Sequence, residues 1–178
     1  ISGMSFGSLS GAALTALNRG AAISGCLHNT GEGGLSPYHL EPGGDIIWQI
    51  GTGYFSARDR QGRFSEEEFA KRATLPNVKM VEIKLSQGAK PGHGGILPAS
   101  KLTPEIVDIR GVEPGHDVVS PPAHTAFSTP TELLQFVKRL RDASGGKPAS
   151  HRTSSQWTVA KVVQAPRPSN SPTRWARR

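Results

Sequence analysis

Short apolar runs interrupted by polar residues recur along the first half of the chain. Residues 78–83 read Val-Lys-Met-Val-Glu-Ile, and residues 46–51 read Ile-Ile-Trp-Gln-Ile-Gly. Residues 26–29 form a shorter run, and residues 1–9 and 118–124 resemble the end of a strand and its loop. Runs of this length bounded by glycine, proline or polar residues predict short β-strands.

Four further segments carry start and stop signals typical of helices. Ser10 before an apolar pattern that ends at Gly25 predicts the first helix, with apolar positions at Ala12, Ala13, Leu14, Leu17, Ala21 and Ile23. Ser65 and Glu68 predict a capping box for a helix to about Ala73, and Thr103-Pro104 predicts a helix to about Arg110. A last helix follows Ser128-Thr129-Pro130 and stops at Gly145-Gly146, with an apolar face at Leu133, Leu134, Phe136, Val137 and Leu140.

Strands that alternate with helices predict an α/β fold with a parallel sheet. The glycine-rich loops follow the strands, which is where α/β proteins bind their ligands. We therefore expect a (β/α)8 barrel of the TIM type, or part of one.

The run at residues 78–83 leads into the richest candidate site in the chain. Lys84, Gln87 and Lys90 follow it, and residues 91–95 then read Pro-Gly-His-Gly-Gly. A backbone with so few side chains can approach a flat or anionic ligand closely. The alternative is an ordinary turn beside two solvated lysines.

Composition limits the classes of protein that are possible. The 178 residues suffice for one domain with a core, and the single cysteine, Cys26, excludes an internal disulfide and any cysteine-ligated cluster made by this chain alone. No apolar run approaches the ~18 residues of a membrane span, and no signal segment is present. The sequence therefore predicts a cytoplasmic protein without membrane contact.

The formal net charge of +7 is unevenly distributed. All 14 acidic residues precede Ala149, whereas six of the 21 basic residues follow it, so the body is nearly neutral and the tail is purely basic. Nucleic acid is thus not an expected partner of the body. Residues 149–178 lack a sustained hydrophobic period, which predicts an irregular, disordered basic tail.

Five segments in the same order carry a family resemblance: residues 3–10 (GMSFGSLS), 29–34 (NTGEGG), 49–53 (QIGTG), 83–95 (IKLSQGAKPGHGG) and 101–106 (KLTPEI). Over residues 1–148 the chain resembles the FMN-binding synthase domain of glutamate synthase, and more closely the stand-alone glutamate-synthase-related proteins. The resemblance implies a barrel with FMN over its carboxyl-terminal mouth. There reduced FMN passes a hydride to 2-iminoglutarate, formed from 2-oxoglutarate and ammonia, and L-glutamate results.

The resemblance also assigns roles to individual residues. It places a first loop against the flavin, with contacts from Gly3, Met4, Ser5, Gly7 and Ser8. Lys84 and Gln87 are implied to face both the flavin and 2-oxoglutarate, because a cation and an amide donor favour the reduced flavin and a carboxylate. Lys90 is implied as a further carboxylate or phosphate contact.

Glu32 lies in the loop where the resemblance implies that ammonia arrives, and a carboxylate can hold ammonium and help remove its proton. Its alternative role is a loop carboxylate that caps backbone amides. Ammonia or glutamine-derived ammonia is the implied second substrate, so a glutaminase or electron-donor subunit is a possible partner. His28, His93 and His124 match no metal-ligand spacing, so no metal site is predicted.

The sequence departs from the family in two ways. The cysteines that ligate a 3Fe-4S cluster in the full enzymes are absent, and so is the glycine-rich segment that binds the FMN phosphate. A whole barrel takes ~250 residues, so residues 1–148 correspond to its amino-terminal half to two-thirds.

The tail suggests the hypothesis of a frameshift. If residues 156–164 have G-ending codons, the frame that starts at the last base of the Gln156 codon encodes Val-Asp-Gly-Gly-Glu-Gly-Gly-Ala, which resembles the missing phosphate segment. The sequence thus predicts an out-of-frame tail after a truncated barrel that is inactive as this fragment. Two alternatives stay open: a non-catalytic remnant whose basic tail binds polyanions, and an N-methylglutamate-forming relative.

Overall fold

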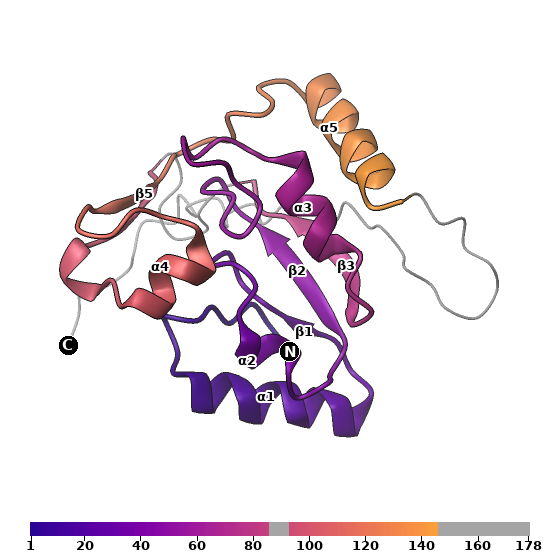
Figure 1. The fold of residues 1–178 in the computed structure, drawn as a ribbon. Coiled ribbons are helices and arrows are strands. Elements are labelled where there is room, and N and C mark those ends of the chain that lie inside the picture. The colour runs from indigo at the N-terminus through magenta and orange to yellow at the C-terminus, as the bar shows by residue number, and fades with distance from the viewer. Residues whose placement is uncertain (86–92, 146–178) are drawn as a thin grey trace, which may run out of the picture.

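The computed structural model describes residues 1–85 and 93–145 (Figure 1). The elements in chain order are α1 (Gly11–Ser24), β1 (His28–Asn29), α2 (Pro37–Leu40), β2 (Ile46–Ile50), α3 (Glu66–Ala73), β3 (Val78–Ile83), β4 (Gly95–Leu97), the 3-10 turn η1 (Ala99–Lys101), α4 (Pro104–Arg110), β5 (Val118–Ser120) and α5 (Pro130–Ala143). No helix within the described ranges is long and apolar enough to cross a membrane.

Strands β1, β2 and β3 form a parallel sheet in the order β1-β2-β3, which confirms the predicted parallel α/β arrangement. The amino-terminal segment runs beside β1, because the Met4 amide donates to the Asn29 carbonyl and the Asn29 amide donates to the Ile1 carbonyl, each over 3.1 Å. Neighbouring strands in sequence are therefore neighbours in space. A βα barrel has this order, although three strands by themselves define only an open parallel sheet.

One face of the sheet forms the hydrophobic core. Ile46, Trp48 and Ile50 alternate with less buried residues along β2, as expected for a strand with one covered face. The Trp48 ring stacks on Phe69 of α3 with centroids 5.4 Å apart, and Phe136 of α5 belongs to the same cluster. Helices α3 and α5 lie together on this side of the sheet (Figure 1).

Some of the remaining strand positions carry polar side chains that contact one another. Gln49 of β2 pairs in register with Glu82 of β3, and its amide donates to the Glu82 carboxylate. Asn29 of β1 donates to the same carboxylate over 3.2 Å. Three strands are thus joined by side chains as well as by their backbone ladder.

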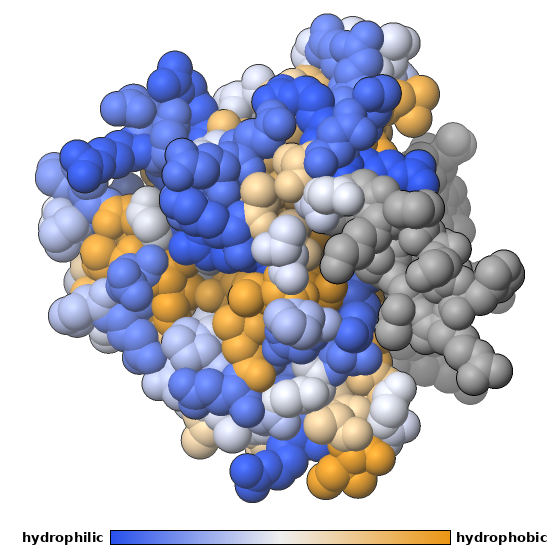
Figure 2. Space-filling view, turned by 45° about the vertical axis from the view of Figure 1, so that its right-hand side comes forward, coloured by the Kyte–Doolittle hydropathy of each residue, from blue (hydrophilic) through white to orange (hydrophobic). Residues whose placement is uncertain are grey.

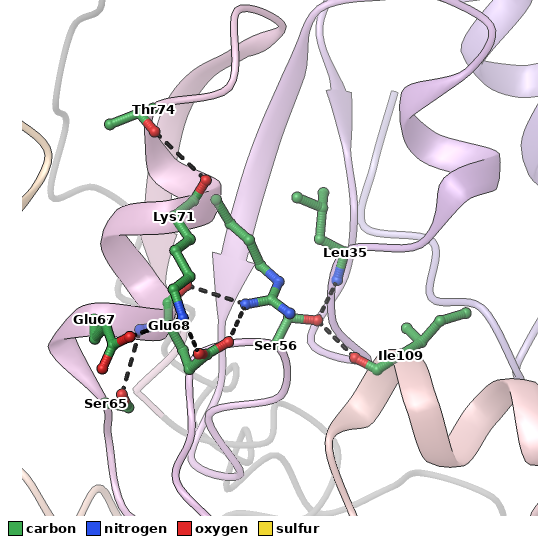
Figure 3. A network of polar contacts seen from close by, with 9 residues as sticks. Leu35, Ser56, Ser65, Glu67, Glu68, Lys71, Thr74 and Ile109 are labelled. Atoms are coloured by element: carbon green, nitrogen blue, oxygen red, sulfur yellow. Dashed lines mark hydrogen bonds and ion pairs between the residues drawn. The ribbon is translucent and has the colours of Figure 1, made fainter.

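The helix starts follow the sequence with one exception. Ser10, Thr103 and Thr129 accept a backbone hydrogen bond as predicted. Ser65 likewise accepts from the Glu68 amide, but the Glu68 carboxylate pairs with Lys71 and Arg72 instead of closing the predicted capping box (Figure 3).

Two large residues assigned to apolar helix faces are exposed to solvent instead. Ile23 is 82% exposed in α1 and Leu134 is 68% exposed in α5. Their contribution to the core was therefore predicted wrongly from periodicity alone.

Strands β4 and β5 form a separate antiparallel pair, and β4 had not been predicted. Ile96 of β4 lies opposite Val119 of β5, and both side chains are largely exposed. Figure 2 shows apolar side chains that reach the surface of one face of the molecule among hydrophilic ones. This pair is covered far less than the parallel sheet.

Candidate active site

The carboxyl ends of the parallel strands meet at one edge of the sheet. The loop 30–34 follows β1, the loop from Gly51 follows β2, and Lys84 follows β3. The Lys84 amide donates to the Ile50 carbonyl over 2.9 Å, so the ladder between β2 and β3 reaches this residue. All three loops are consequently held at the same edge.

Lys84 and Glu32 form an ion pair across this edge. The Lys84 Nζ lies 2.9 Å from the Glu32 Oε1, and the two side chains are 19% and 26% exposed. The sequence places these residues 52 positions apart, and the sheet brings them together. A partly buried pair is screened by salt less than an exposed one, so both charges act on their surroundings.

Glycine at position 51 permits this approach. A Cβ atom there would lie 2.8 Å from the Glu32 Oε2, closer than real Cβ contacts allow. Any larger residue would displace the Glu32 carboxylate from the end of β2. This close contact explains why the first glycine of the QIGTG segment at residues 49–53, Gly51, has to be a glycine.

The first loop packs against the loop that carries Glu32. Gly31 has a φ of +65°, and a Cβ atom there would lie 2.7 Å from the Ser5 Oγ. Met4 and Ser5 are half-buried, whereas Gly3, Gly7 and Ser8 are exposed. The backbone of this predicted flavin loop is therefore accessible beside the Lys84–Glu32 pair.

His39 forms a hydrogen bond with the backbone of the first loop. Its Nε2 lies 2.8 Å from the Met4 carbonyl oxygen, and its Nδ1 lies 2.7 Å from the Ser36 Oγ. A carbonyl only accepts, so His39 donates through Nε2 and accepts at Nδ1. Burial lowers the pKa of His39 and so favours the neutral ring, and the hydrogen bond to the Met4 carbonyl acts in the opposite direction.

Arg110 is a second cation at this edge, and sequence reasoning missed it. Its guanidinium donates to the Phe6 carbonyl over 3.4 Å and lies 4.9 Å from the Phe55 ring centroid. Burial lowers the pKa of Arg110, and the nearby charge of Glu32 acts in the opposite direction. Arg110 is the last residue of α4, and a basic residue there is ordinarily explained by its favourable interaction with the helix dipole. The sequence alone therefore did not indicate a role in the site.

Ser56 connects the loop after β2 to α4, the helix that carries Arg110. Its hydroxyl donates to the Ile109 carbonyl over 2.7 Å and accepts from the Leu35 amide over 2.9 Å (Figure 3). Ser56 has a φ of +65°, a conformation that costs a non-glycine residue ~1–2 kcal/mol. The two hydrogen bonds hold this strained residue, and with it the position of α4.

Gln87 and Lys90, which the sequence assigns to the same site, lie outside the described residues. Glu32 and Lys84 are brought together, and Met4 and Ser5 lie in the adjacent loop. Within residues 1–85 and 93–145, no three His, Cys, Asp or Glu side chains are grouped as metal ligands would be. The described cluster is thus one carboxylate near two cations, suited to an anionic ligand.

The fold and this cluster define an α/β protein with its charged groups at the carboxyl edge of a parallel sheet. The conserved region of glutamate synthase matches residues 1–167. The chain therefore belongs to the glutamate synthase family, as the five segments predict.

Individual relatives are similar over most of this chain. The glutamate synthase large subunit-like protein YerD of Bacillus subtilis is 49% identical over 148 residues, which cover 83% of this chain and 28% of that protein. The archaeal glutamate synthase (NADPH) of Methanocaldococcus jannaschii is 36% identical over 148 residues, 83% of this chain and 26% of its own length. The glutamate synthase (NADPH) large chain of Bacillus subtilis is 37% identical over 147 residues, only 9% of that protein. The chain thus spans less than a third of each relative.

Proposed function

We propose that this chain carries part of the active site of an FMN-dependent glutamate synthase, which converts 2-oxoglutarate and ammonia to L-glutamate through 2-iminoglutarate. The observation that carries the proposal is the Lys84–Glu32 ion pair at the carboxyl edge of the sheet. Family membership supports the same reading. In this proposal residues 1–148 are the amino-terminal half to two-thirds of a (β/α)8 barrel.

The residues present fit FMN as the cofactor. The exposed backbone of Gly3, Gly7 and Ser8 offers a surface for a flat ring, and Lys84 supplies a cation at the same edge. Bound FMN would supply the hydride for reduction. The role of the chain is to hold the ring, to stabilise negative charge beside it and to limit the access of water.

The two cations have a role in substrate binding. Lys84 and Arg110 can each bind a carboxylate of 2-oxoglutarate, and an arginine does so with two parallel hydrogen bonds. Gln87 and Lys90 are assigned to the same substrate and cofactor by resemblance. In this way Lys84 and Arg110 would together orient 2-oxoglutarate so that its keto carbon faces the incoming ammonia.

Glu32 has a role in delivering ammonia. Its carboxylate can hold an ammonium ion and accept one proton, which leaves ammonia free to attack the keto carbon. Loss of water then gives 2-iminoglutarate. Glu32 pairs with Lys84 over 2.9 Å. When both substrates bind, Glu32 would exchange Lys84 for ammonium, and Lys84 would exchange Glu32 for the carboxylate of 2-oxoglutarate.

An isotope experiment tests this function on the chain itself. FMN binding is followed by quenching of flavin fluorescence, and reduced FMN, 2-oxoglutarate and 15N-ammonium are then supplied together. 15N-glutamate, detected by mass spectrometry, is the product expected of the whole barrel, whereas this chain alone is expected to bind FMN and 2-oxoglutarate without turnover. Methylamine in place of ammonium tests the N-methylglutamate-forming alternative, for which N-methylglutamate would be the larger product. A chain that binds neither FMN nor 2-oxoglutarate would contradict the proposal and favour a non-catalytic remnant.

The out-of-frame tail is a proposal that depends on the coding DNA. The family match extends past residue 148, where the segment resemblance ends, and reaches residue 167. Resequencing from the Gly145 codon decides the matter. An intact frame that continues into a glycine-rich phosphate segment would mean that the gene encodes a full FMN enzyme, and confirmation of the present frame would mean that the chain is a truncated remnant.

A further inference from the structure

A relay of hydrogen bonds leads from the core to the end of β3. The Ala126 amide donates to the Tyr54 hydroxyl over 3.1 Å, and this hydroxyl lies 3.0 Å from the His124 Nδ1. The His124 Nε2 lies 2.8 Å from the Lys84 carbonyl oxygen. Lys84 is one residue beyond the last ladder pair of β2 and β3, Ile50 with Ile83.

The chemistry of the groups fixes the direction of each bond. The Lys84 carbonyl only accepts, so His124 carries its proton on Nε2. The Nδ1 of the same neutral ring must then accept, and the Tyr54 hydroxyl is its donor. That hydroxyl in turn accepts from the Ala126 amide, so each member of the relay is satisfied.

The environment of the relay favours this single arrangement. Burial lowers the pKa of His124, against its hydrogen bond to Lys84, and burial raises the pKa of Tyr54. Both rings therefore remain neutral near pH 7. His124 also stacks on Phe127, with centroids 4.6 Å apart and planes 21° apart.

The backbone at Tyr54 indicates that the relay is firmly held. Tyr54 is fully buried and adopts a φ of +50°, a backbone conformation that residues other than glycine rarely adopt. Such strain persists only where surrounding contacts over-determine the position. The hydroxyl bonds and the ring contacts with His124 and Phe64 supply those contacts.

We infer that His124 is a positioning residue: its Nε2–H bond to the Lys84 carbonyl fixes the end of β3, so that the Lys84 ammonium faces Glu32. The Lys84 amide is bound to Ile50 and its carbonyl to His124, so both backbone groups of this residue are held. The inference rests on the proposed function only for what Lys84 then binds.

Two amide substitutions separate this role from simple packing. His124→Gln places an amide donor near the position of Nε2, whereas His124→Asn has a shorter side chain that cannot reach the Lys84 carbonyl. Both remove the aromatic ring and both are neutral, so each is a control for the other. Urea unfolding of both variants measures any loss of global stability.

The readout is the rate at which an amine-acylating reagent modifies Lys84, measured by peptide mass spectrometry. Lys79, near the opposite end of β3, is the internal reference. We expect His124→Asn to raise the rate at Lys84 relative to Lys79 roughly five-fold, the factor that corresponds to one hydrogen bond. His124→Gln is expected to restore a rate close to that of the parent chain.

Two results would overturn the inference. One is a Lys84 rate in His124→Asn equal to the parent rate, and the other is an equal rise at Lys79 and Lys84, which indicates general loosening. A parallel titration with 2-oxoglutarate keeps the two proposals distinct. If the acylation pattern holds but 2-oxoglutarate does not bind, the positioning role stands and the proposed function fails.

Discussion

The parallel sheet and the segment 93–126 are built by different means. In the sheet, Trp48 and its neighbours are buried in register against α3 and α5. In the later segment, the two-stranded pair exposes Ile96 and Val119. Yet this less buried segment supplies Arg110 and His124, which reach back to the edge where Lys84 lies.

The difference separates stability from function within one chain. The sheet and the helices packed on it provide the main hydrophobic cluster, and the loops after its strands carry Lys84 and Glu32. The segment 93–126 contributes little core but completes the surroundings of Lys84 and Glu32. Substitutions in the two regions should therefore affect different measurements.

The largest expected effect is on the sheet. Trp48→Ala removes a fully buried ring stacked on Phe69 and should lower the free energy of unfolding by about 3–5 kcal/mol. Urea unfolding followed by circular dichroism measures this loss, with Trp48→Phe as a smaller change at the same site. A loss below 1 kcal/mol in Trp48→Ala would contradict the assignment of the core to this face.

A second expected effect is on the pH dependence of stability. Burial, the charge of His39 and the amino terminus lower the pKa of His28 from 6.5 to about 4. The unfolded chain then binds more protons than the folded chain between these values. Stability is therefore full above pH 6.5 and falls by about 3 kcal/mol as pH decreases to 4.

Replacement of His28 isolates this contribution. His28→Asn lacks the titrating ring, so its stability should depend less on pH between 6.5 and 4 than that of the parent chain. Carboxylates such as Glu68 and Asp59 titrate in both proteins, and the difference between them cancels their share. Parallel pH profiles in the two proteins would show that His28 does not titrate in this way.

Much of the sheet could be predicted from the sequence, because its signals are local. The apolar alternation at residues 46–50 and the caps at Ser10 and Thr129 act within a few residues, and the structure confirms them. Strand β4 was missed because three residues beside a glycine-rich loop carry almost no period. Its partner β5 begins 21 positions after the end of β4, a separation that no local pattern encodes.

The candidate site could be predicted only in part, for the same reason. The resemblance supplied Lys84 and Glu32, and the fold brought them within 2.9 Å. Arg110 and His124 gave no distinctive signal, because one ends a helix and the other follows two prolines in a loop. Their roles depend on contacts with Phe6 and Lys84, which only the folded chain creates.

A smaller effect is expected where the later segment supports the sheet edge. Tyr54→Phe keeps the ring but removes the hydroxyl that joins Ala126 to His124, at a cost of about 1 kcal/mol in unfolding free energy. Acylation of Lys84 should rise less than in His124→Asn, since the His124 bond to Lys84 is still possible. Thermal unfolding and the same peptide measurement test both points; an effect larger than that of His124→Asn would reverse the proposed order of the relay.

The smallest effect is expected at the exposed strand pair. Ile96→Thr changes a side chain that is 70% exposed and should alter the free energy of unfolding by no more than about 0.5 kcal/mol. Urea unfolding beside Trp48→Ala gives the comparison directly. A loss above 2 kcal/mol would mean that β4 and β5 belong to the core after all.

The most direct test of the proposed function is 2-oxoglutarate binding by Lys84→Met and Lys79→Met, measured by isothermal titration calorimetry. The two lysines lie toward opposite ends of β3, and Lys79 pairs with Asp45 at 3.6 Å, away from Glu32. We predict that Lys84→Met weakens binding roughly ten-fold or more, as expected for loss of a charged hydrogen bond. Lys79→Met should bind like the parent chain. Equal affinities in all three proteins would contradict the assignment of substrate binding to the Lys84 edge.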